Sequence, residues 1–224
     1  MSRDSKPPVI AIDGPSASGK GTVAARVAEA LGFHYLDSGA LYRLIALAAR
    51  GCGVDLDDEE ALAELAGSLQ VEFRDGATWL RARDVTAALR SEEVGTAASR
   101  VAAQGRVRQA LLARQRAFRT APGLVADGRD MGSVVFPDAP LKVFLTAGVD
   151  TRAERRYKQL MEKGMYAKMS DVVEELRRRD ERDSSRPVAP LKHYPDAIFL
   201  DTTGLSVDQA VRRILGWWRE KSRG

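Results

Sequence analysis

The sequence predicts an α/β fold in which helices cover both faces of a parallel β-sheet. Five short apolar runs lie next to polar or small residues, and segments with apolar residues at helical spacing follow most of them. One internal segment breaks this alternation with apolar residues at every second position, which is typical of a small antiparallel insert. The expected strands of the main sheet are Val9–Ile12, Tyr35–Leu36, Leu124–Ala126, Leu141–Leu145 and Ala197–Leu200.

The first two expected helices follow the first two strands. Apolar side chains recur at helical spacing from Val23 to Leu31, and Gly32 is the expected C-terminal cap of that helix. Ser38 is expected to cap the second helix at its N-terminus, and Gly51 is expected to end it. Both helices therefore have local signals at their ends.

Two later helix starts match the capping-box spacing, in which a Ser or Thr pairs with a Glu or Gln three residues on. These pairs are Thr151 with Glu154, and Ser206 with Gln209. The last helix is expected to bury one apolar face after Ser206. That face consists of Val207, Val211, Ile214, Leu215 and Trp218.

Residues 71–89, VEFRDGATWLRARDVTAAL, form the segment with period-two spacing. Their Asp75-Gly76 pair is a turn signal between short strands. We therefore expect a hairpin or a three-stranded insertion subdomain at about residues 65–95. The rest of the 224 residues is expected to form the single domain that carries it.

The composition, with 44% hydrophobic and 29% charged residues, is that of an ordinary globular protein. No apolar run approaches the roughly 18 residues that a membrane span needs. The residues MSRDSKPP lack the apolar core of a signal peptide, and Cys52 is the only cysteine. We therefore expect a cytoplasmic protein with no membrane partner and no disulfide.

The charge balance gives weak support for a nucleic-acid partner, because 35 basic residues face 31 acidic ones and the net charge is only +4. Arginines gather at residues 100–119, 152–156 and 177–186, but acidic residues interleave with the second and third groups and no aromatic stacking pattern accompanies any of them. We expect no nucleic-acid partner. A nucleic-acid-binding module with salt-sensitive affinity and no phosphoryl transfer is the alternative from another class of protein.

The loop after the first expected strand carries the strongest chemical signal. Gly14 and Gly19-Lys20 fit the phosphate-binding pattern G-x-x-x-x-G-K, with an apolar strand before the loop and an amphipathic helix after it. Backbone N–H groups, the positive end of the helix and Lys20 would face an anion there. This context predicts a nucleotide phosphate site, although glycines alone would also serve a tight turn.

The residues after Lys20 exclude a GTPase. Gly21 stands where a GTPase loop has the Ser or Thr that binds Mg²⁺, and Thr22 follows one residue late. The Asn-Lys-x-Asp sequence that reads guanine does not occur in the chain. Mg²⁺ keeps several water ligands and readily binds nucleotide phosphates. We therefore expect Mg²⁺ to bind as a complex with ATP, and we expect no metal site formed by the protein.

Four motifs together resemble the cytidylate kinase family of nucleoside monophosphate kinases. They are GPSASGKGT at 14–22, LDSGALYR at 36–43, ADGRDMGSVVFPDAP at 126–140 and RRRDERDSSRPVAPL at 177–191. The resemblance implies a five-stranded parallel sheet with helices on both faces, a nucleoside-monophosphate-binding insert at 65–95 and an arginine-rich lid at 152–190. It implies direct transfer of the ATP γ-phosphate to CMP or dCMP, with small-molecule nucleotides as the only partners. We expect a monomer.

The resemblance also implies roles for individual residues. ATP binding falls on Gly14, Pro15, Ser16, Ala17, Ser18, Gly19, Lys20, Gly21 and Thr22. Cytosine contacts fall on Ser38, Ser99, Arg108 and Asp130. Contacts with the acceptor phosphate fall on Arg43, Arg129 and Arg186, and contacts with the sugar fall on Arg179 and Asp183. The catalytic residues implied are Lys20, Arg129, Arg155, Arg156 and Arg186.

Some of these residues have a plainer structural interpretation. Ser38 could serve only as a helix cap, Arg108 only as a charge on a helix surface, and Asp183 only as the i,i+4 partner of Arg179. The DGRD sequence is harder to explain in this way. It follows an apolar strand at its C-terminal end, where open α/β sheets bind their ligands.

The chemistry of the acceptor agrees with these assignments. A phosphate monoester has a second pKa of about 6, so at neutral pH it is mostly a dianion and needs no general base to attack. Transfer instead requires two polyanions in line and neutralisation of charge on the moving phosphoryl group, which arginine forks supply. Arg152, Arg155 and Arg156 share one helix face, and we expect that face in a lid over ATP.

The loop itself is common to many small P-loop kinases. A kinase that acts on a different nucleotide, or on a shikimate-like metabolite, is therefore the nearest alternative within the same class. A panel of acceptors in an ADP-release assay separates these possibilities.

Overall fold

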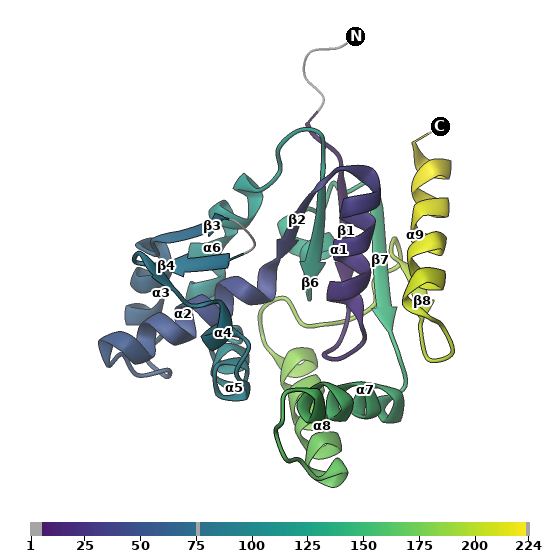
Figure 1. Ribbon diagram of the computed structural model, residues 1–224. Helices are drawn as coiled ribbons and strands as arrows, with labels where there is room; N and C mark the ends of the chain where they lie inside the picture. The colour runs from purple at the N-terminus through teal and green to yellow at the C-terminus, as the bar shows by residue number, and fades with distance from the viewer. Residues whose placement is uncertain (1–5, 75–76, 223–224) are drawn as a thin grey trace. The chain divides into compact units, whose positions relative to one another are not determined.

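The computed structural model describes residues 6–74 and 77–222 of the chain (Figure 1). The chain divides into two compact units, one formed by residues 1–36 and 118–224 and the other by residues 37–117. Within the described residues, no helix combines the length and apolarity that crossing a membrane requires. The first unit carries the main sheet, and the second carries the small antiparallel sheet.

The main sheet has five strands in the order β2-β6-β1-β7-β8. Its strands are β1 (Val9–Asp13), β2 (His34–Asp37), β6 (Leu124–Gly128), β7 (Leu141–Thr146) and β8 (Ile198–Asp201). β1 pairs in parallel with β6 and β7, and β7 pairs in parallel with β8. The predicted fold class is therefore confirmed, and each expected strand lies within two residues of an observed one.

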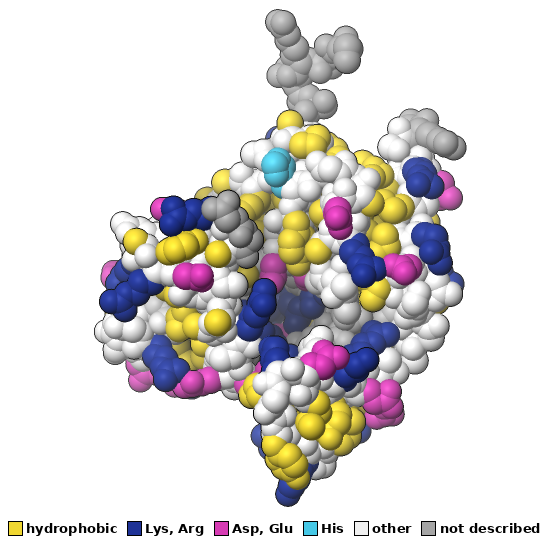
Figure 2. Space-filling view, in the orientation of Figure 1, with side chains coloured by type: hydrophobic (Ala, Val, Ile, Leu, Met, Phe, Trp, Pro, Cys, Tyr) yellow, Lys and Arg dark blue, Asp and Glu magenta, His cyan; other side chains and the backbone are white. Residues whose placement is uncertain are grey.

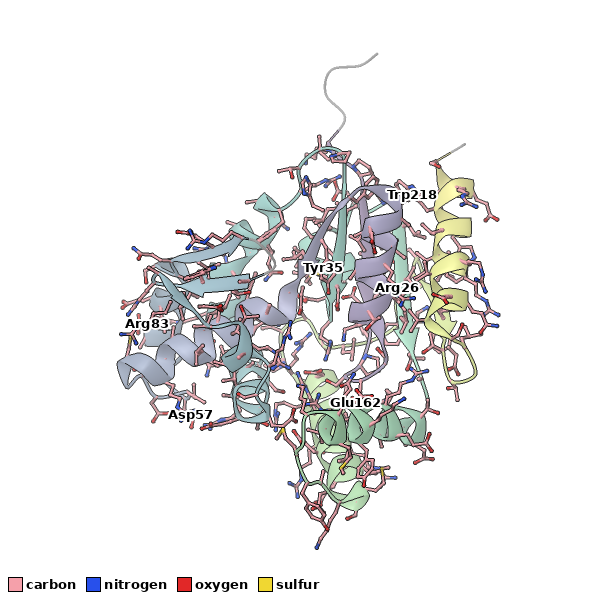
Figure 3. The ribbon with its side chains drawn as sticks, in the orientation of Figure 1. Arg26, Tyr35, Asp57, Arg83, Glu162 and Trp218 are labelled. Atoms are coloured by element: carbon pink, nitrogen blue, oxygen red, sulfur yellow. The ribbon has the colours of Figure 1, made fainter. Side chains whose placement is uncertain are left out.

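The helices α1 (Lys20–Leu31) and α9 (Val207–Lys221) pack together against one face of this sheet. The central strand β1 is buried along its whole length, because sheet neighbours and helices cover it on all sides. Figure 3 labels Trp218 and Arg26 at the contact of the two helices. The Trp218 ring meets Phe33 edge-on, with 5.7 Å between centroids, and Arg26 forms an exposed ion pair with Asp208 at 2.5 Å.

Three further elements of the first unit follow β6 and β7. They are the single π-helical turn η1 (Met131–Val135) and the helices α7 (Val149–Glu162) and α8 (Met169–Ser185). α7 and α8 pack side by side through a small apolar cluster of their own (Figure 1). That cluster consists of Ala153, Leu160, Val172 and Leu176.

The capping predictions have mixed outcomes. The capping box of Ser206 with Gln209 is present, and Gly32 ends α1 in a left-handed conformation. The box expected at Thr151 is wrong, because α7 already begins at Val149 with Gly148 as its N-cap. The Gly148 N–H binds the Thr203 hydroxyl at 2.9 Å, so a contact distant in sequence fixes this helix start.

In its described residues, the second unit combines five helices with a meander of three short strands. Its elements are α2 (Ser38–Cys52), α3 (Glu59–Gly67), β3 (Val71–Arg74), β4 (Ala77–Leu80), β5 (Arg83–Asp84), α4 (Thr86–Leu89), α5 (Glu92–Val101) and α6 (Gly105–Ala117). The strands β3, β4 and β5 form an antiparallel sheet in that order. The predicted small antiparallel sheet is therefore confirmed.

The ends of α2 and of the meander differ from expectation. Asp37, rather than Ser38, is the N-cap of α2, because its carboxylate accepts the Ala40 N–H at 3.2 Å. The helix ends at the left-handed Gly53 instead of Gly51. After β5 the chain turns into α4, since the Asp84 carboxylate accepts the Thr86 N–H at 2.9 Å. The predicted Asp75-Gly76 turn lies outside the described residues.

Candidate active site

The phosphate-binding loop connects the C-terminal end of β1 to the start of α1. A Cβ atom at Gly14 would lie 1.9 Å from the carbonyl oxygen of Leu145, so only glycine allows the loop to pass this close to β7. Gly19 has a φ of 89° and is the N-cap of α1, where it offers no side chain to occupy the N–H groups of the first turn. The helix end is therefore open to an external anion.

Lys20 lies inside this loop, with only 9% of its surface exposed. Its Nζ donates to the carbonyl oxygen of Pro15 at 3.3 Å and lies 3.9 Å from the Asp127 carboxylate at the end of β6. The Tyr35 hydroxyl donates to the same carboxylate at 3.1 Å, and Figure 3 labels this tyrosine on β2. The lysine charge is thus held at the loop by a buried carboxylate.

Arg129, the first residue after β6, joins three parts of the first unit. Its Nη2 donates to the Ser16 hydroxyl of the loop at 2.8 Å, and its Nη1 donates to the carbonyl oxygen of Gly128 at 3.2 Å. Its Nε binds the Asp183 carboxylate of α8 at 2.7 Å, with both side chains largely buried. The arginine side chain that follows β6 therefore contacts both the phosphate-binding loop and α8.

Asp183 lies in a strongly positive environment. Burial opposes ionisation of its carboxyl, but the charges of Arg129, Arg179 and Arg186 outweigh that cost and lower its pKa below 3.8. Arg186 is itself 5% exposed and donates from Nε to the carbonyl oxygen of Ala189 at 2.6 Å. Arg129 lowers the pKa of Asp183 more than Arg179 or Arg186 does, so Asp183 is more than an i,i+4 partner of Arg179.

Arginines of α7 reach the same loop from another side. Arg152 is buried, binds Asp180 through both terminal nitrogens at 3.1 and 2.6 Å, and donates to the Ser16 carbonyl oxygen at 3.2 Å. Arg155 donates to the carbonyl oxygens of Ser18 at 3.0 Å and Thr202 at 2.7 Å. The loop backbone is therefore fastened to α7 by two guanidinium groups.

Arg156, the third arginine of the expected face, is half-buried and donates to the Gln159 side chain at 3.2 Å. This hydrogen bond lies within α7 itself. The contact of Arg152 with the phosphate-binding loop could not be predicted from sequence spacing. Spacing shows which residues share a helix face, but it does not show which segment lies against that face.

Asp130 begins the π-helical turn η1 and is buried. Its carbonyl oxygen accepts the N–H groups of Val134 at 2.9 Å and Val135 at 3.2 Å. The next two N–H groups, of Met131 and Gly132, donate to the carboxylate of Asp13 at 2.8 and 2.9 Å. Asp13 was not expected as a site residue, although its position at the end of an apolar strand was a usable signal.

Four of the expected nucleotide contacts belong to the second unit, where three of them are buried. These residues are Ser38, Arg43, Ser99 and Arg108. Arg108 donates to the carbonyl oxygen of Ala102 at 2.9 Å, and its guanidinium lies 5.6 Å from the centre of the Tyr42 ring. Its exposure of 8% rules out a role as a surface charge only. Arg43 donates to the carbonyl oxygen of Leu89 at 2.8 Å.

In the part of the chain that the structure describes, no three His, Cys, Asp or Glu side chains gather into a cluster that could hold a metal ion. Oxygen ligands do lie at the loop, because an Asp127 carboxylate oxygen is 3.0 Å from the place of a Cβ atom at Gly21. This arrangement fits a hard cation that keeps water and nucleotide oxygens as most of its ligands.

A strand–loop–helix unit with a buried lysine, open helix N–H groups and surrounding arginines defines a P-loop phosphotransferase. Comparison with known proteins identifies the family: the cytidylate kinase model matches residues 10–220, so the chain belongs to the cytidylate kinase family and is a nucleoside monophosphate kinase. The cytidylate kinase of Chromobacterium violaceum is 61% identical over 214 residues, which is 96% of each chain. That of Nitrosomonas europaea is 57% identical over 213 residues, covering 95% of this chain and 96% of the relative.

A solved structure of an uncharacterized protein from Eubacterium ventriosum shares the fold. Its TM-score is 0.51 at 13% identity, and the alignment covers 94% of this chain and 97% of that one. At this identity the likeness concerns the fold alone.

The pairing of Arg129 with Asp183 has a consequence for stability. We expect Arg129→Met to lower the free energy of unfolding by about 3–5 kcal/mol at pH 7, because Asp183 would remain buried and charged without its nearest partner. The lowered pKa of Asp183 means that the pair stabilises the fold above pH 3.8, and that this contribution is lost as the pH falls through the folded-state pKa. Urea unfolding at pH 7, 5 and 3 measures the difference between wild type and variant.

That difference should shrink towards pH 3, and a difference that stays constant from pH 7 to pH 3 would contradict the assignment. Arg26→Met is the matched control, because it removes an arginine from an exposed ion pair with Asp208. We expect it to cost no more than about 1 kcal/mol.

Proposed function

We propose that this chain transfers the γ-phosphoryl group of ATP to CMP or dCMP, giving ADP and CDP or dCDP, by direct in-line displacement. The observation that carries the proposal is the bond from Arg129 to Ser16. It puts an arginine that the family resemblance assigns to the acceptor phosphate in contact with the loop that would hold the ATP phosphates. Donor and acceptor phosphates would thus share one positively charged region.

On the ATP side, residues 14–22 would surround the phosphates with backbone N–H groups, and Lys20 would add a full charge. Lys20 is already held in the loop by Pro15 and Asp127, so little side-chain freedom would be lost when ATP binds. Arg155 and Arg156 of α7 would supply further positive charge to the transferring group. Residues 152–190, which include α7 and α8, would act as the lid over ATP.

On the acceptor side, Arg43, Arg129 and Arg186 would bind the phosphate of CMP. Its dianionic oxygen attacks without a general base, so these arginines serve to align it and to neutralise charge. Arg179 and Asp183 would contact the sugar. Ser38, Ser99, Arg108 and Asp130 would recognise cytosine, and residues 65–95 would belong to the subdomain that binds the nucleoside monophosphate.

Mg²⁺ would bind mainly through ATP oxygens and water, with Thr22 and Asp127 offering protein oxygens at the loop. When bound, it neutralises charge on the β- and γ-phosphates. We further propose that the protein acts as a monomer in the cytoplasm, where its nucleotide substrates are found.

The test of this function is a panel of acceptors in an ADP-release assay with ATP. We expect CMP and dCMP to be phosphorylated well, UMP poorly, and AMP, GMP and shikimate not at all. Lys20→Ala is the control without the loop charge, and its turnover should be about 10²- to 10³-fold lower. Preferred turnover of another acceptor, or near-normal turnover by Lys20→Ala, would contradict the proposal.

Asp130→Asn tests how the base is chosen. Cytosine offers an N4 amino donor to a carboxylate, whereas uracil places the O4 acceptor there, so the carboxylate disfavours UMP. We expect the CMP-over-UMP preference in kcat/KM to fall roughly 10- to 100-fold, mostly through lost CMP activity.

The matched control is Asp138→Asn, whose carboxylate instead binds Arg119 at 2.7 Å. It should leave the preference unchanged. An equal fall in both activities of Asp130→Asn would mean that Asp130 supports Arg129 or phosphate transfer instead of reading the base.

A further inference from the structure

Residues 192–197, KHYPDA, connect the end of α8 to β8, and we refer to them as the strap. The residue before the strap, Leu191, donates its N–H to the carbonyl oxygen of Asp183 at 2.8 Å. Within the strap, the His193 ring lies edge-on to Phe144 and Phe199, with centroid distances of 5.7 and 5.5 Å. The strap is therefore fixed to the sheet and to the end of α8.

Tyr194 is the strap residue that reaches the site. Its hydroxyl donates to the Asp13 carboxylate at the end of β1, and it also forms a hydrogen bond with the Ser133 side chain. Asp13 is the group that accepts the N–H groups of Met131 and Gly132. Asp13 therefore holds the start of η1 on one side and Tyr194 on the other.

The strap also contacts η1 directly. A Cβ atom at Gly132 would lie 3.1 Å from the Tyr194 hydroxyl and 3.2 Å from the Lys142 side chain, so this glycine fits closely between them. Lys142 is fixed in turn by an ion pair with Asp196 of the strap at 2.5 Å. The first residues after Asp130 are therefore confined by Tyr194 of the strap, by Lys142 of β7 and by Asp13.

Asp130 is close enough to this network for its charge to matter. Burial and the charge of Asp130 both raise the pKa of Asp13, while the N–H groups of Gly132 and Met131 and the Tyr194 hydroxyl lower it. Burial and the charges of Asp13 and Asp130 raise the pKa of Tyr194, so its hydroxyl keeps its proton and remains a donor. Removing that donor would leave a buried carboxylate with fewer partners, which is costly.

We propose that Tyr194 is a positioning residue for base selection: through Asp13 it fixes the turn that presents Asp130 to cytosine. The proposal rests on the function proposed above, and it gives the strap a role in choosing the acceptor. Tyr194 itself needs no contact with substrate. Its effect should therefore appear in the acceptor preference and not in the use of ATP.

Tyr194→Phe removes one hydroxyl and keeps the ring. We expect the CMP-over-UMP preference in kcat/KM to fall roughly 3- to 30-fold, in line with a lost hydrogen bond to a buried charge. The KM for ATP should stay within about twofold, because the hydroxyl of Tyr194 forms its hydrogen bonds with Asp13 and Ser133 and not with residues 14–22. Ser222→Ala is the control, since it removes a hydroxyl whose hydrogen bond, to the carbonyl oxygen of Arg219 at 3.2 Å, lies at the end of α9, outside the residues proposed to bind substrate. The exposed surface of that helix carries charged side chains (Figure 2).

A second substitution tests the same inference without changing Tyr194. Gly132→Ala places a methyl group against the Tyr194 hydroxyl and Lys142. It should lower the CMP-over-UMP preference and leave the KM for ATP within about twofold of wild type. Circular dichroism and melting curves of both variants separate misplacement of Asp130 from unfolding, because a purely structural role would lower the melting temperature and leave the preference unchanged.

The possible outcomes are distinct. If Tyr194→Phe and Gly132→Ala both keep the wild-type preference, the inference is overturned while the cytidylate kinase reaction stands. An equal loss of CMP and UMP activity overturns it as well. If the wild-type chain itself fails to phosphorylate CMP, the proposed function fails first.

Discussion

The guanidinium of Arg129 is the contact on which the rest of the site depends. Three separate segments, the loop at Ser16, the end of β6 and helix α8 at Asp183, meet at this one planar group. A guanidinium suits this task because its donors point in fixed directions and its charge persists at all physiological pH values. In the proposed reaction the same donors would turn to the acceptor phosphate, and Asp183 would keep the guanidinium oriented until that phosphate binds.

Three buried carboxylates around this centre each have a specific donor set. Asp127 faces Lys20 and Tyr35, Asp183 faces arginines, and Asp13 accepts two N–H groups and a phenol. Such pairing is required, since an unpaired buried charge would cost several kcal/mol. This pairing also fixes the lysine and arginine side chains that, in the proposed reaction, would reduce the repulsion between the two polyanionic substrates. The fold therefore separates two tasks: Asp127 and Asp183 hold cationic side chains, whereas Asp13 holds the backbone of η1.

The sequence was most informative where the signal is local, although the local signals at Ser38 and Gly51 misplaced the ends of α2. Strand positions, the box at Ser206, Gly32 and the phosphate-binding loop were all predictable from a few neighbouring residues. The start of α7 was not, because Thr203 fixes it from more than fifty residues away. The same holds within the site: Arg129 meets Asp183 across 54 positions, and Asp13 meets Tyr194 across 181. Spacing indicates which residues share a helix face, but it does not say which distant segment lies opposite.

The claim that Arg129 acts through the geometry of its fork, and not through charge alone, is tested most directly by kcat/KM for CMP in Arg129→Lys. Lysine keeps the positive charge but binds as a single point, so it cannot join Ser16, Asp183 and a phosphate at once. We expect kcat/KM to fall by roughly 10²- to 10³-fold, with a smaller loss of folding stability than in Arg129→Met. A lysine variant within about threefold of wild type, a change below 1 kcal/mol in transition-state free energy, would contradict this account.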